Sequence, residues 1–221
     1  PADPVRTYLA LRTLNPAPYG GYLQYADRHG RMRLLSSSPE RFATIDRHRV
    51  VETKPIKGTT PRSTDPDHDR ALRERLTGDP KIVAENLMIV DLLRNDVGMV
   101  SRPGTVAVPG LMEVESYRSV HQLVSTVRGD LRDDVDTMSA LRALFPAGSM
   151  TGAPKRRTME IIEAVEEGPR GVYSGAFGWI HADGRADLGV VIRSLVAWQP
   201  PPASVGRDPV WTYEWGTGGG V

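Results

Sequence analysis

The strongest constraint on the fold is a succession of short, strand-like apolar runs that are joined by tight turns. Near the start of the chain these runs alternate with Asn-Pro, Arg-His-Gly and Ser-rich turn signals. They are Val5–Leu14, Gly21–Ala26, Arg31–Leu35, Arg41–Ile45 and Val50–Thr53. Residues 172–198 predict a longer hairpin around Asp183-Gly184. Because connections this short join antiparallel strands, the sheets are expected to be largely antiparallel.

Helices are predicted between these groups of strands. Asp65-Pro66 reads as an N-cap followed by proline in the first turn, and Gly78 as the end of that helix. The run Lys81–Asp96 is apolar nearly all round, which predicts a buried helix. The remaining elements are a strand at Gln122–Arg128, helices at Thr137–Phe145 and Pro154–Glu167, and a last strand at Val210–Trp215. The predicted fold class is α+β, with helices outside largely antiparallel sheets.

Composition excludes several classes of function. The 221 residues are 39% hydrophobic and 25% charged, which is typical of a globular protein, and the net charge of +1 does not favour nucleic acid as a partner. There is no cysteine, so disulfides and thiolate chemistry are excluded, and a cytoplasmic location is expected. No run approaches the roughly 18 apolar residues of a membrane span. The chain opens on Pro1 and stops at Val221 inside a predicted turn, so we expect an excerpt of a longer polypeptide.

The segment Pro55-Ile56-Lys57-Gly58-Thr59 is the most informative one for function, and we interpret it as a loop. Proline fixes its own φ, and glycine allows the backbone to approach a ligand closely. A partly desolvated amine in such a segment becomes a nucleophile or a base. Taken alone, a solvated surface lysine is the more common explanation.

Two charged residues lie in apolar surroundings. Glu85 shares a helix face with Ile82, Ile89 and Leu92, so its carboxylate either pairs with an arginine or helps to bind magnesium. Arg193 lies in a predicted strand with two apolar faces, and its guanidinium suits a carboxylate, which a structural Asp or Glu could also supply. Tyr173, in the other strand of the same predicted hairpin, offers a further hydrogen-bond donor.

Three other features admit either a binding role or a purely structural one. The turn Gly148–Pro154 enters a helix and contains Ser149 and Thr151; it could bind a carboxylate or phosphate, or these hydroxyls could simply cap the helix. His121 precedes an apolar strand and could be a histidine at the edge of the core. The run Gly218–Gly220 would allow backbone amides to approach a ligand, or would form an ordinary turn. Together the candidates suggest a carboxylated small molecule.

Six motifs that occur in order along the chain resemble the catalytic region of the chorismate-utilising enzymes. This family includes anthranilate, aminodeoxychorismate, isochorismate and salicylate synthases. The motifs are Ser38-Pro39-Glu40-Arg41-Phe42, Pro55–Thr59, Ala84–Leu92, Arg94-Asn95-Asp96, His121–Ser125 and Thr151–Lys155. Within the family, a lysine at position 57 is similar to the aminodeoxychorismate synthases, because anthranilate synthases typically have alanine there.

The resemblance implies a role for each matching residue. Lys57 matches the nucleophile that adds to the chorismate ring as the ring hydroxyl leaves, after which ammonia displaces the lysine. Glu40 matches the acid that assists departure of the hydroxyl, His121 the histidine against the reacting ring, and Glu85 one magnesium ligand. The positions that match substrate-binding residues are Gly58, Thr59, Ser149, Tyr173, Arg193, Gly218 and Gly220.

The resemblance also implies a pathway, a cofactor and partners. The expected reaction is amination of chorismate to 4-amino-4-deoxychorismate for p-aminobenzoate, folate or a related aromatic amine, with magnesium as cofactor and ammonia from a glutamine amidotransferase subunit or fused domain. The chain is expected to be a single catalytic region over residues 1–221 that lacks the N-terminal part and the C-terminal end of the family fold, including the second magnesium carboxylate. Anthranilate synthesis, or a non-catalytic relic of the fold, remains an alternative.

Overall fold

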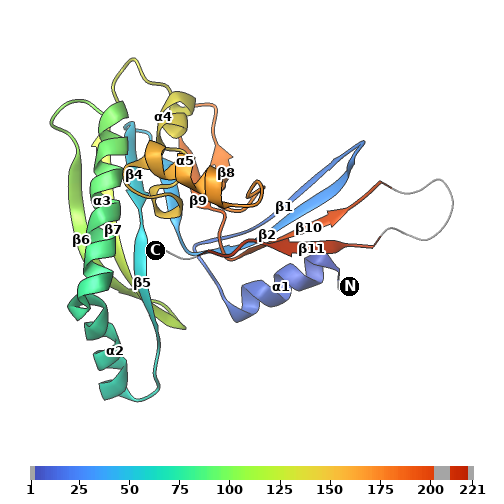
Figure 1. The fold of residues 1–221 in the computed structure, drawn as a ribbon, viewed down its shortest axis with the longest axis horizontal. Helices are drawn as coiled ribbons and strands as arrows, with labels where there is room; N and C mark the ends of the chain where they lie inside the picture. Colours follow the sequence, from blue (N-terminus) through green and yellow to red (C-terminus); the bar gives the residue numbers. More distant parts are fainter. Residues whose placement is uncertain (1–2, 202–209, 219–221) are drawn as a thin grey trace. The chain divides into compact units, whose positions relative to one another are not determined.

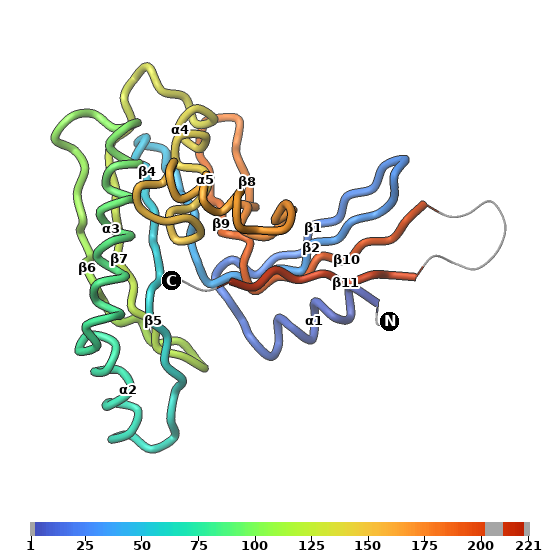
Figure 2. The backbone as a smooth tube through the Cα atoms, in the orientation of Figure 1, coloured from blue at the N-terminus to red at the C-terminus, as the bar shows by residue number. Residues whose placement is uncertain are grey.

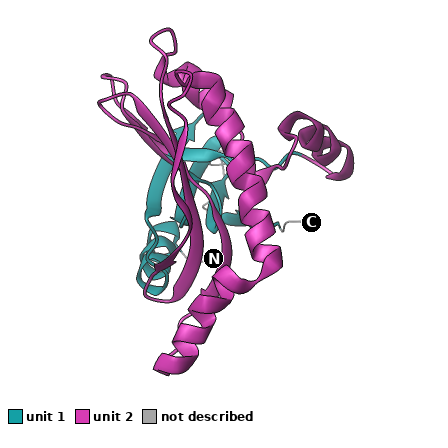
Figure 3. Cartoon of the chain, turned by 90° about the vertical axis from the view of Figure 1, so that its left-hand side faces the viewer, with its two compact units in different colours: residues 1–40, 169–177, 189–221 teal, residues 41–168, 178–188 magenta. Residues whose placement is uncertain are grey.

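The computed structural model of this chain describes residues 3–201 and 210–218. These residues form two compact units, shown in separate colours in Figure 3. Unit 1 comprises residues 1–40, 169–177 and 189–221, and unit 2 comprises residues 41–168 and 178–188. Each unit is built on its own sheet, and the assigned strand pairs run antiparallel. The predicted α+β class is therefore confirmed.

Unit 1 contains a four-stranded sheet in the order β1-β2-β10-β11, together with one helix (Figure 1). Its elements are α1 (Pro4–Leu14), β1 (Tyr19–Asp27), β2 (Gly30–Ser38), β10 (Ser194–Gln199) and β11 (Thr212–Trp215). Buried side chains of α1, β2 and β10 meet in a small core of Tyr8, Leu35 and Ala197. The last strand was predicted correctly, although it begins two residues later.

The first predicted strand is wrong, because residues 4–14 form helix α1. The cause is local: the side chain of Asp3 accepts hydrogen bonds from the backbone N–H groups of Val5 and Arg6, and Pro4 occupies the first turn. Both features favour a helix N-terminus. The Asp-Pro signal that correctly predicted the helix after Asp65 was present here as well.

Unit 2 contains a seven-stranded sheet in the order β5-β7-β4-β3-β9-β8, with β6 paired to the other side of β7. Its elements are β3 (Arg41–Ile45), β4 (Val50–Lys54), β5 (Ile56–Pro61), α2 (Pro66–Gly78), α3 (Pro80–Val100), β6 (Ala107–Ser116), β7 (Val120–Asp130), α4 (Thr137–Leu144), the 3₁₀ turn η1 (Gly148–Met150) and α5 (Lys155–Val165). The division between the units falls within β8 (Ala176–Ile180) and β9 (Ala186–Val190).

Strands β4 and β5 follow one another along the same side of β7, as the tube in Figure 2 makes clear. Helix α3 packs along β7 and buries Ile89, Leu92 and Leu93. Its other side is open to solvent, where Leu87 and Met88 are exposed. The prediction that this helix is buried all round was therefore wrong, whereas its position was correct. None of the described helices is both long and apolar enough to span a bilayer.

Three further predictions need correction. Residues 56–61 form strand β5 rather than a loop, and β6 was missed, because Pro109 and Gly110 are residues that usually interrupt a strand. The predicted hairpin exists as β8 and β9, but its second strand ends at Val190 and the chain enters β10 in the other sheet. Tyr173 therefore lies in a turn before β8, and Arg193 in a bend with φ +50°, so neither residue is in a strand.

Candidate functional site

The segment that carries Lys57 is a β-bulge in β5. Ile56 pairs with Val124 and Thr59 with Gln122, so Lys57 and Gly58 together face a single residue of β7. Bulges of this kind redirect a side chain and are common beside active sites. The side chain of Lys57 is half-buried, and within the described part of the chain it makes no hydrogen bond or ion pair. The bulge thus positions the amine of Lys57, and no other side chain in the described residues pairs with it.

Glycine at position 58 is required by both conformation and space. Its φ is +93°, a value that favours glycine, and an added Cβ would lie 2.6 Å from Cγ2 of Ile82 in α3. Glu85 lies one turn after Ile82 on the same helix, which directs it to the same side. The structure therefore brings Lys57, Gly58 and the exposed Thr59 to the part of α3 that carries Glu85.

Glu85 is less buried than the sequence suggested. Its side chain is 35% exposed, and its Oε1 lies 3.8 Å from Nζ of Lys81, which is itself 80% exposed. The alternative in which Glu85 pairs with an arginine is thus wrong, and the observed ion pair with Lys81 is a loose one on the surface of α3. Magnesium is often held by one or two carboxylates with water and substrate oxygens completing the shell, so a single, loosely paired carboxylate fits such a role. Among residues 3–201 and 210–218 no cluster of three or more potential metal ligands occurs.

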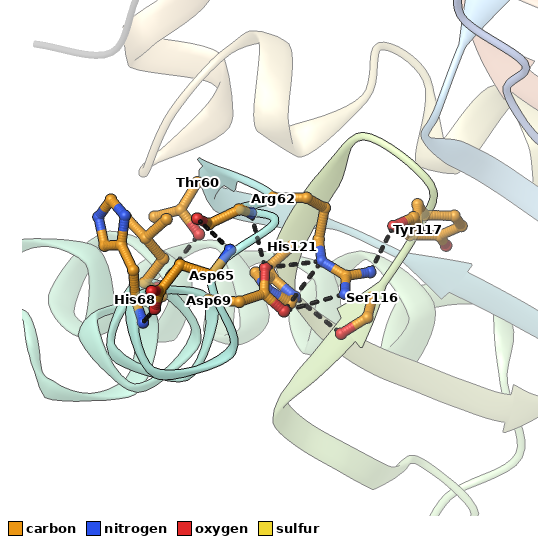
Figure 4. A network of polar contacts seen from close by, with 10 residues as sticks. Thr60, Arg62, Asp65, His68, Asp69, Ser116, Tyr117 and His121 are labelled. Atoms are coloured by element: carbon orange, nitrogen blue, oxygen red, sulfur yellow. Dashed lines mark hydrogen bonds and ion pairs between the residues drawn. The ribbon is translucent and has the colours of Figure 1, made fainter.

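His121 is buried and engaged at both ring nitrogens (Figure 4). Its Nδ1 lies 2.7 Å from Oγ of Ser116, and its Nε2 lies 3.1 Å from Oδ1 of Asp69 in α2. Since an ionised carboxylate only accepts hydrogen bonds, Nε2 donates to Asp69. His121 faces the helices α2 and α3 together with Ser125, whose Oγ donates to Oδ1 of Asn86 at 2.6 Å.

Asp69 is held in its ionised form. Arg62 donates to both of its carboxylate oxygens, Nε to Oδ1 and Nη2 to Oδ2, each at 2.9 Å, and the backbone N–H of Ser63 donates to Oδ1. The hydrogen bonds from Arg62, followed by that from Ser63, hold the pKa of Asp69 well below its usual value. The Arg62–Asp69–His121 arrangement therefore ties β5, α2 and β7 together, and its role toward a ligand stays a prediction.

The opposite face of β7 carries polar residues that sequence reasoning missed. Gln122 is buried, and its Nε2 has no partner within the described residues. On the neighbouring strand, Glu115 accepts hydrogen bonds from Lys54 at 2.5 Å and from the hydroxyl of Tyr117 at 2.6 Å. Burial, reinforced by Glu115, raises the pKa of Tyr117 to about 12. Although burial acts to raise the pKa of Glu115, the bonds from Lys54 and Tyr117 lower it. These residues meet because β4 and β6 both pair with β7.

The turn before α5 does not use its hydroxyls as helix caps. Helix α5 has Pro154 at its N-cap position and no side-chain cap, so the predicted capping by Ser149 or Thr151 is not observed. Thr151 instead donates to the carbonyl oxygens of Ala147 and Gly148, each at 3.3 Å. Ser149 is half-buried within η1. Its contact with a ligand stays a prediction.

Unit 1 holds the other predicted site residues. The ring of Tyr173 lies against Gly216, where a Cβ would overlap it, and its hydroxyl would lie 2.7 Å from a Cβ at Gly218. Hydrogen bonds between Ser174 and Val191 and between Val191 and Gly175 join the turn of Tyr173 to the segment that precedes Arg193. The guanidinium of Arg193 is exposed and has no side-chain partner in the described residues.

Two predicted residues at the ends of unit 1 segments complete the set. Glu40 is buried at 6% exposure, and its backbone is fixed because its N–H donates to Oγ of Ser38 and its carbonyl accepts from the N–H of Val190. Gly220 lies outside the described residues. Within unit 1, Tyr173 thus lies close to Gly218, and the turn that carries Tyr173 is hydrogen-bonded to the segment that precedes Arg193.

Comparisons with known proteins all point to enzymes that bind chorismate. A family model described as chorismate binding enzyme matches residues 1–221. The aminodeoxychorismate synthase of Streptomyces pristinaespiralis is 56% identical over 195 residues, which are 88% of this chain and 27% of that protein. The chloroplastic aminodeoxychorismate synthase of Arabidopsis thaliana is 50% identical over 88% of this chain and 21% of its own length.

Solved structures extend the comparison to the fold. The crystal structure of anthranilate synthase component I from Streptococcus pneumoniae matches with a TM-score of 0.78 and 37% identity, over 89% of this chain and 42% of that one. The chain thus spans about a quarter of the length of these two aminodeoxychorismate synthases and less than half of this solved structure.

Proposed function

This chain belongs to the chorismate binding enzymes, and we propose that it carries out the amination of chorismate to 4-amino-4-deoxychorismate. The observation that carries the proposal is the amine of Lys57, which is half-buried on a bulge, without a partner in the described residues. The similarity to aminodeoxychorismate synthases supports the same choice. A lysine whose donors are not engaged by the protein is free to act on a bound molecule.

The proposed reaction has two substitutions. In the first, Nζ of Lys57 forms a bond to a ring carbon, the ring double bonds shift, and the hydroxyl leaves as water with a proton from Glu40. In the second, ammonia forms a bond to the carbon that lost the hydroxyl, the double bonds shift back, and the bond to Lys57 breaks. Each step is balanced without an oxidant or a reductant, so no redox cofactor is needed.

Other residues are proposed to bind and orient the substrate. Arg193 and Tyr173, with the backbone at Gly218 and Gly220, would bind its carboxylates. The guanidinium of Arg193 is exposed and has no side-chain partner among residues 3–201 and 210–218, which suits it to an anion. In unit 2, Gly58, Thr59 and Ser149 would contact the substrate, and His121 would lie against the ring. Glu85 would supply one ligand to magnesium, and the bound cation would offset the charge of a substrate carboxylate.

Two parts of the proposal concern partners and location. Ammonia would come from a glutamine amidotransferase subunit or domain, and the product would serve p-aminobenzoate or folate synthesis. A cytoplasmic location likewise stays a prediction. Anthranilate synthesis is the competing reaction, since the S. pneumoniae enzyme shares the fold.

Product analysis tests the proposal. The full-length protein is incubated with chorismate, magnesium and ammonium, and the products are separated by chromatography. Formation of 4-amino-4-deoxychorismate by the wild type supports the proposal. Formation of anthranilate instead selects the competing reaction, and chorismate binding without turnover selects the non-catalytic relic. In Lys57→Ala, any residual chemistry should move toward anthranilate, because ammonia can then attack the position that the lysine would have occupied.

A further inference from the structure

A second lysine, Lys155, lies partly buried at the start of α5, and the reaction outlined above does not use it. Its side chain is 15% exposed, and its Nζ lies 2.5 Å from Oδ2 of Asp96 in α3. The same ammonium donates to the carbonyl oxygens of Leu144 and Pro146, each at 2.8 Å. The ammonium of Lys155 therefore combines one ion pair with two hydrogen bonds to backbone carbonyl groups.

Asp96 is buried even more deeply, with 2% of its side chain exposed. Burial raises the pKa of this carboxyl, while the hydrogen bond and charge of Lys155 act in the opposite direction. Burying two charges is costly, and an apolar pair of similar size often stabilises a core as well or better. A contribution to folding stability is therefore a weak explanation for this ion pair. The backbone groups that Lys155 contacts suggest a stronger explanation.

The contacts of Lys155 lie on both sides of the turn that contains Ser149. The carbonyl of Leu144 ends α4, and that of Pro146 begins the turn, whereas Lys155 itself follows the turn in sequence. Between these points Gly148 packs on α3 so closely that a Cβ would lie 2.9 Å from Cδ2 of Leu92. The turn is thus fixed at its two ends by Lys155 and at its centre by α3.

We propose that Lys155 and Asp96 are a positioning pair that sets the conformation of residues 145–154, and through it the contact of Ser149 with the substrate. The inference rests on the proposed function, because it takes chorismate as the ligand of Ser149. Neither member of the pair contacts the substrate in this account. Lys155 orders the two carbonyl groups, and Asp96 fixes the position of the ammonium.

Paired variants separate positioning from stability. Lys155→Met leaves the carboxylate of Asp96 buried without its counterion, so the melting temperature should fall by several degrees. Lys155→Met combined with Asp96→Asn removes both charges, and much of the lost melting temperature should return. The carbonyls of Leu144 and Pro146 still lack their donor in the double variant. Its Kd for chorismate should therefore stay raised by about tenfold, with kcat changed much less.

A second comparison tests whether the effect acts through Ser149. Ser149→Ala should weaken chorismate binding to a similar extent, and adding the double change to Ser149→Ala should cost little more, because coupled residues are not additive. Arg157→Lys, on the exposed side of α5, serves as the matched control and should leave binding unchanged.

The outcomes distinguish the inference from the proposed function. The inference is overturned if chorismate affinity returns together with the melting temperature in the double variant, or if its effect adds fully to that of Ser149→Ala. Equal binding by the wild type and all variants overturns the inference together with the proposed contact of Ser149, and leaves the proposed reaction standing. A well-folded wild type that binds no chorismate overturns the proposed function and this inference with it.

Discussion

Two lysines of unit 2, both within motifs that resemble the same family, occupy opposite chemical environments. Lys57 lies on the bulge of β5 and has no side-chain partner in the described residues. Lys155 lies at the start of α5 and engages one carboxylate and two carbonyl oxygens. An ammonium that is bound by a carboxylate and by backbone carbonyl groups of the protein stabilises a conformation, whereas an amine without such partners remains available to a ligand. The contrast separates residues that form the site from residues that maintain it.

The largest expected effect is on turnover, and it tests the reactive side of this contrast. Lys57→Ala should lower kcat for 4-amino-4-deoxychorismate by about a thousandfold or more, because the nucleophile is lost. Since Lys57 has no partner to lose among the residues that the structure describes, the melting temperature and the Kd for chorismate should change little. Steady-state kinetics and thermal denaturation measure the two effects. Lys57→Arg, which keeps the charge, should be equally inactive; an active Lys57→Arg would mean that only the charge matters.

Glu85 offers the next largest effect, because its carboxylate is only loosely paired. Glu85→Gln should weaken magnesium binding by about 100-fold or more, because the loss of a direct metal ligand weakens binding more than the loss of a residue that only orients a ligand. Magnesium-dependent thermal stabilisation in the presence of chorismate provides a readout that does not depend on turnover. Asp91→Asn is a matched control, because Asp91 lies on the same helix in a comparable exposed ion pair with Arg94. Equal magnesium affinity in both variants would assign Glu85 a surface role.

Arg193 extends the same reasoning to unit 1 with a smaller effect. Arg193→Lys should raise KM for chorismate by about tenfold, since an ammonium cannot reproduce the planar fork of a guanidinium. The melting temperature should hardly change, because the side chain has no partner in the described residues. Kinetics over a range of chorismate concentrations tests this. A KM equal to that of the wild type would remove Arg193 from the substrate-binding residues.

The secondary structure could be predicted where its signals are local. Asp65 and Gly78 mark the bounds of α2, and both do so in the structure. Strand β5 was missed because Pro55 and Gly58 look like a loop, although here they bend and bulge a strand. The opening helix was missed because its apolar residues were given more weight than its Asp3-Pro4 start. The Asp3-Pro4 pair by itself would have predicted this helix.

The partners of the candidate site residues could not be predicted from the sequence. His121 and Asp69 are 52 residues apart and meet only because α2 packs near the start of β7. Asp96 and Lys155 belong to two recognised motifs, but their ion pair depends on how α5 returns toward α3. Family motifs thus indicated which residues matter, whereas only the fold separates engaged groups from available ones.

The smallest predicted effect concerns a group that is fully engaged, Asp69. Its pKa is depressed in the folded state, so its contribution to stability is complete above the ordinary carboxyl pKa of about 4 and is lost as pH falls below that value. Asp69→Asn should therefore melt at a lower temperature than the wild type near pH 7, and the difference should shrink from about pH 5 downward. Thermal melts across this range, with the exposed Asp67→Asn as control, measure it. A difference that does not vary with pH would contradict the assignment.

The most direct test of the account is the intact mass of the protein during the reaction. The full-length wild type is mixed with chorismate and magnesium while ammonia is withheld. We predict an adduct whose mass equals chorismate less one water, located by peptide mapping at Lys57 and discharged when ammonium is added. Lys57→Ala should form no adduct and no 4-amino-4-deoxychorismate. The central claim is contradicted if no adduct forms and Lys57→Ala makes that product at a rate close to that of the wild type.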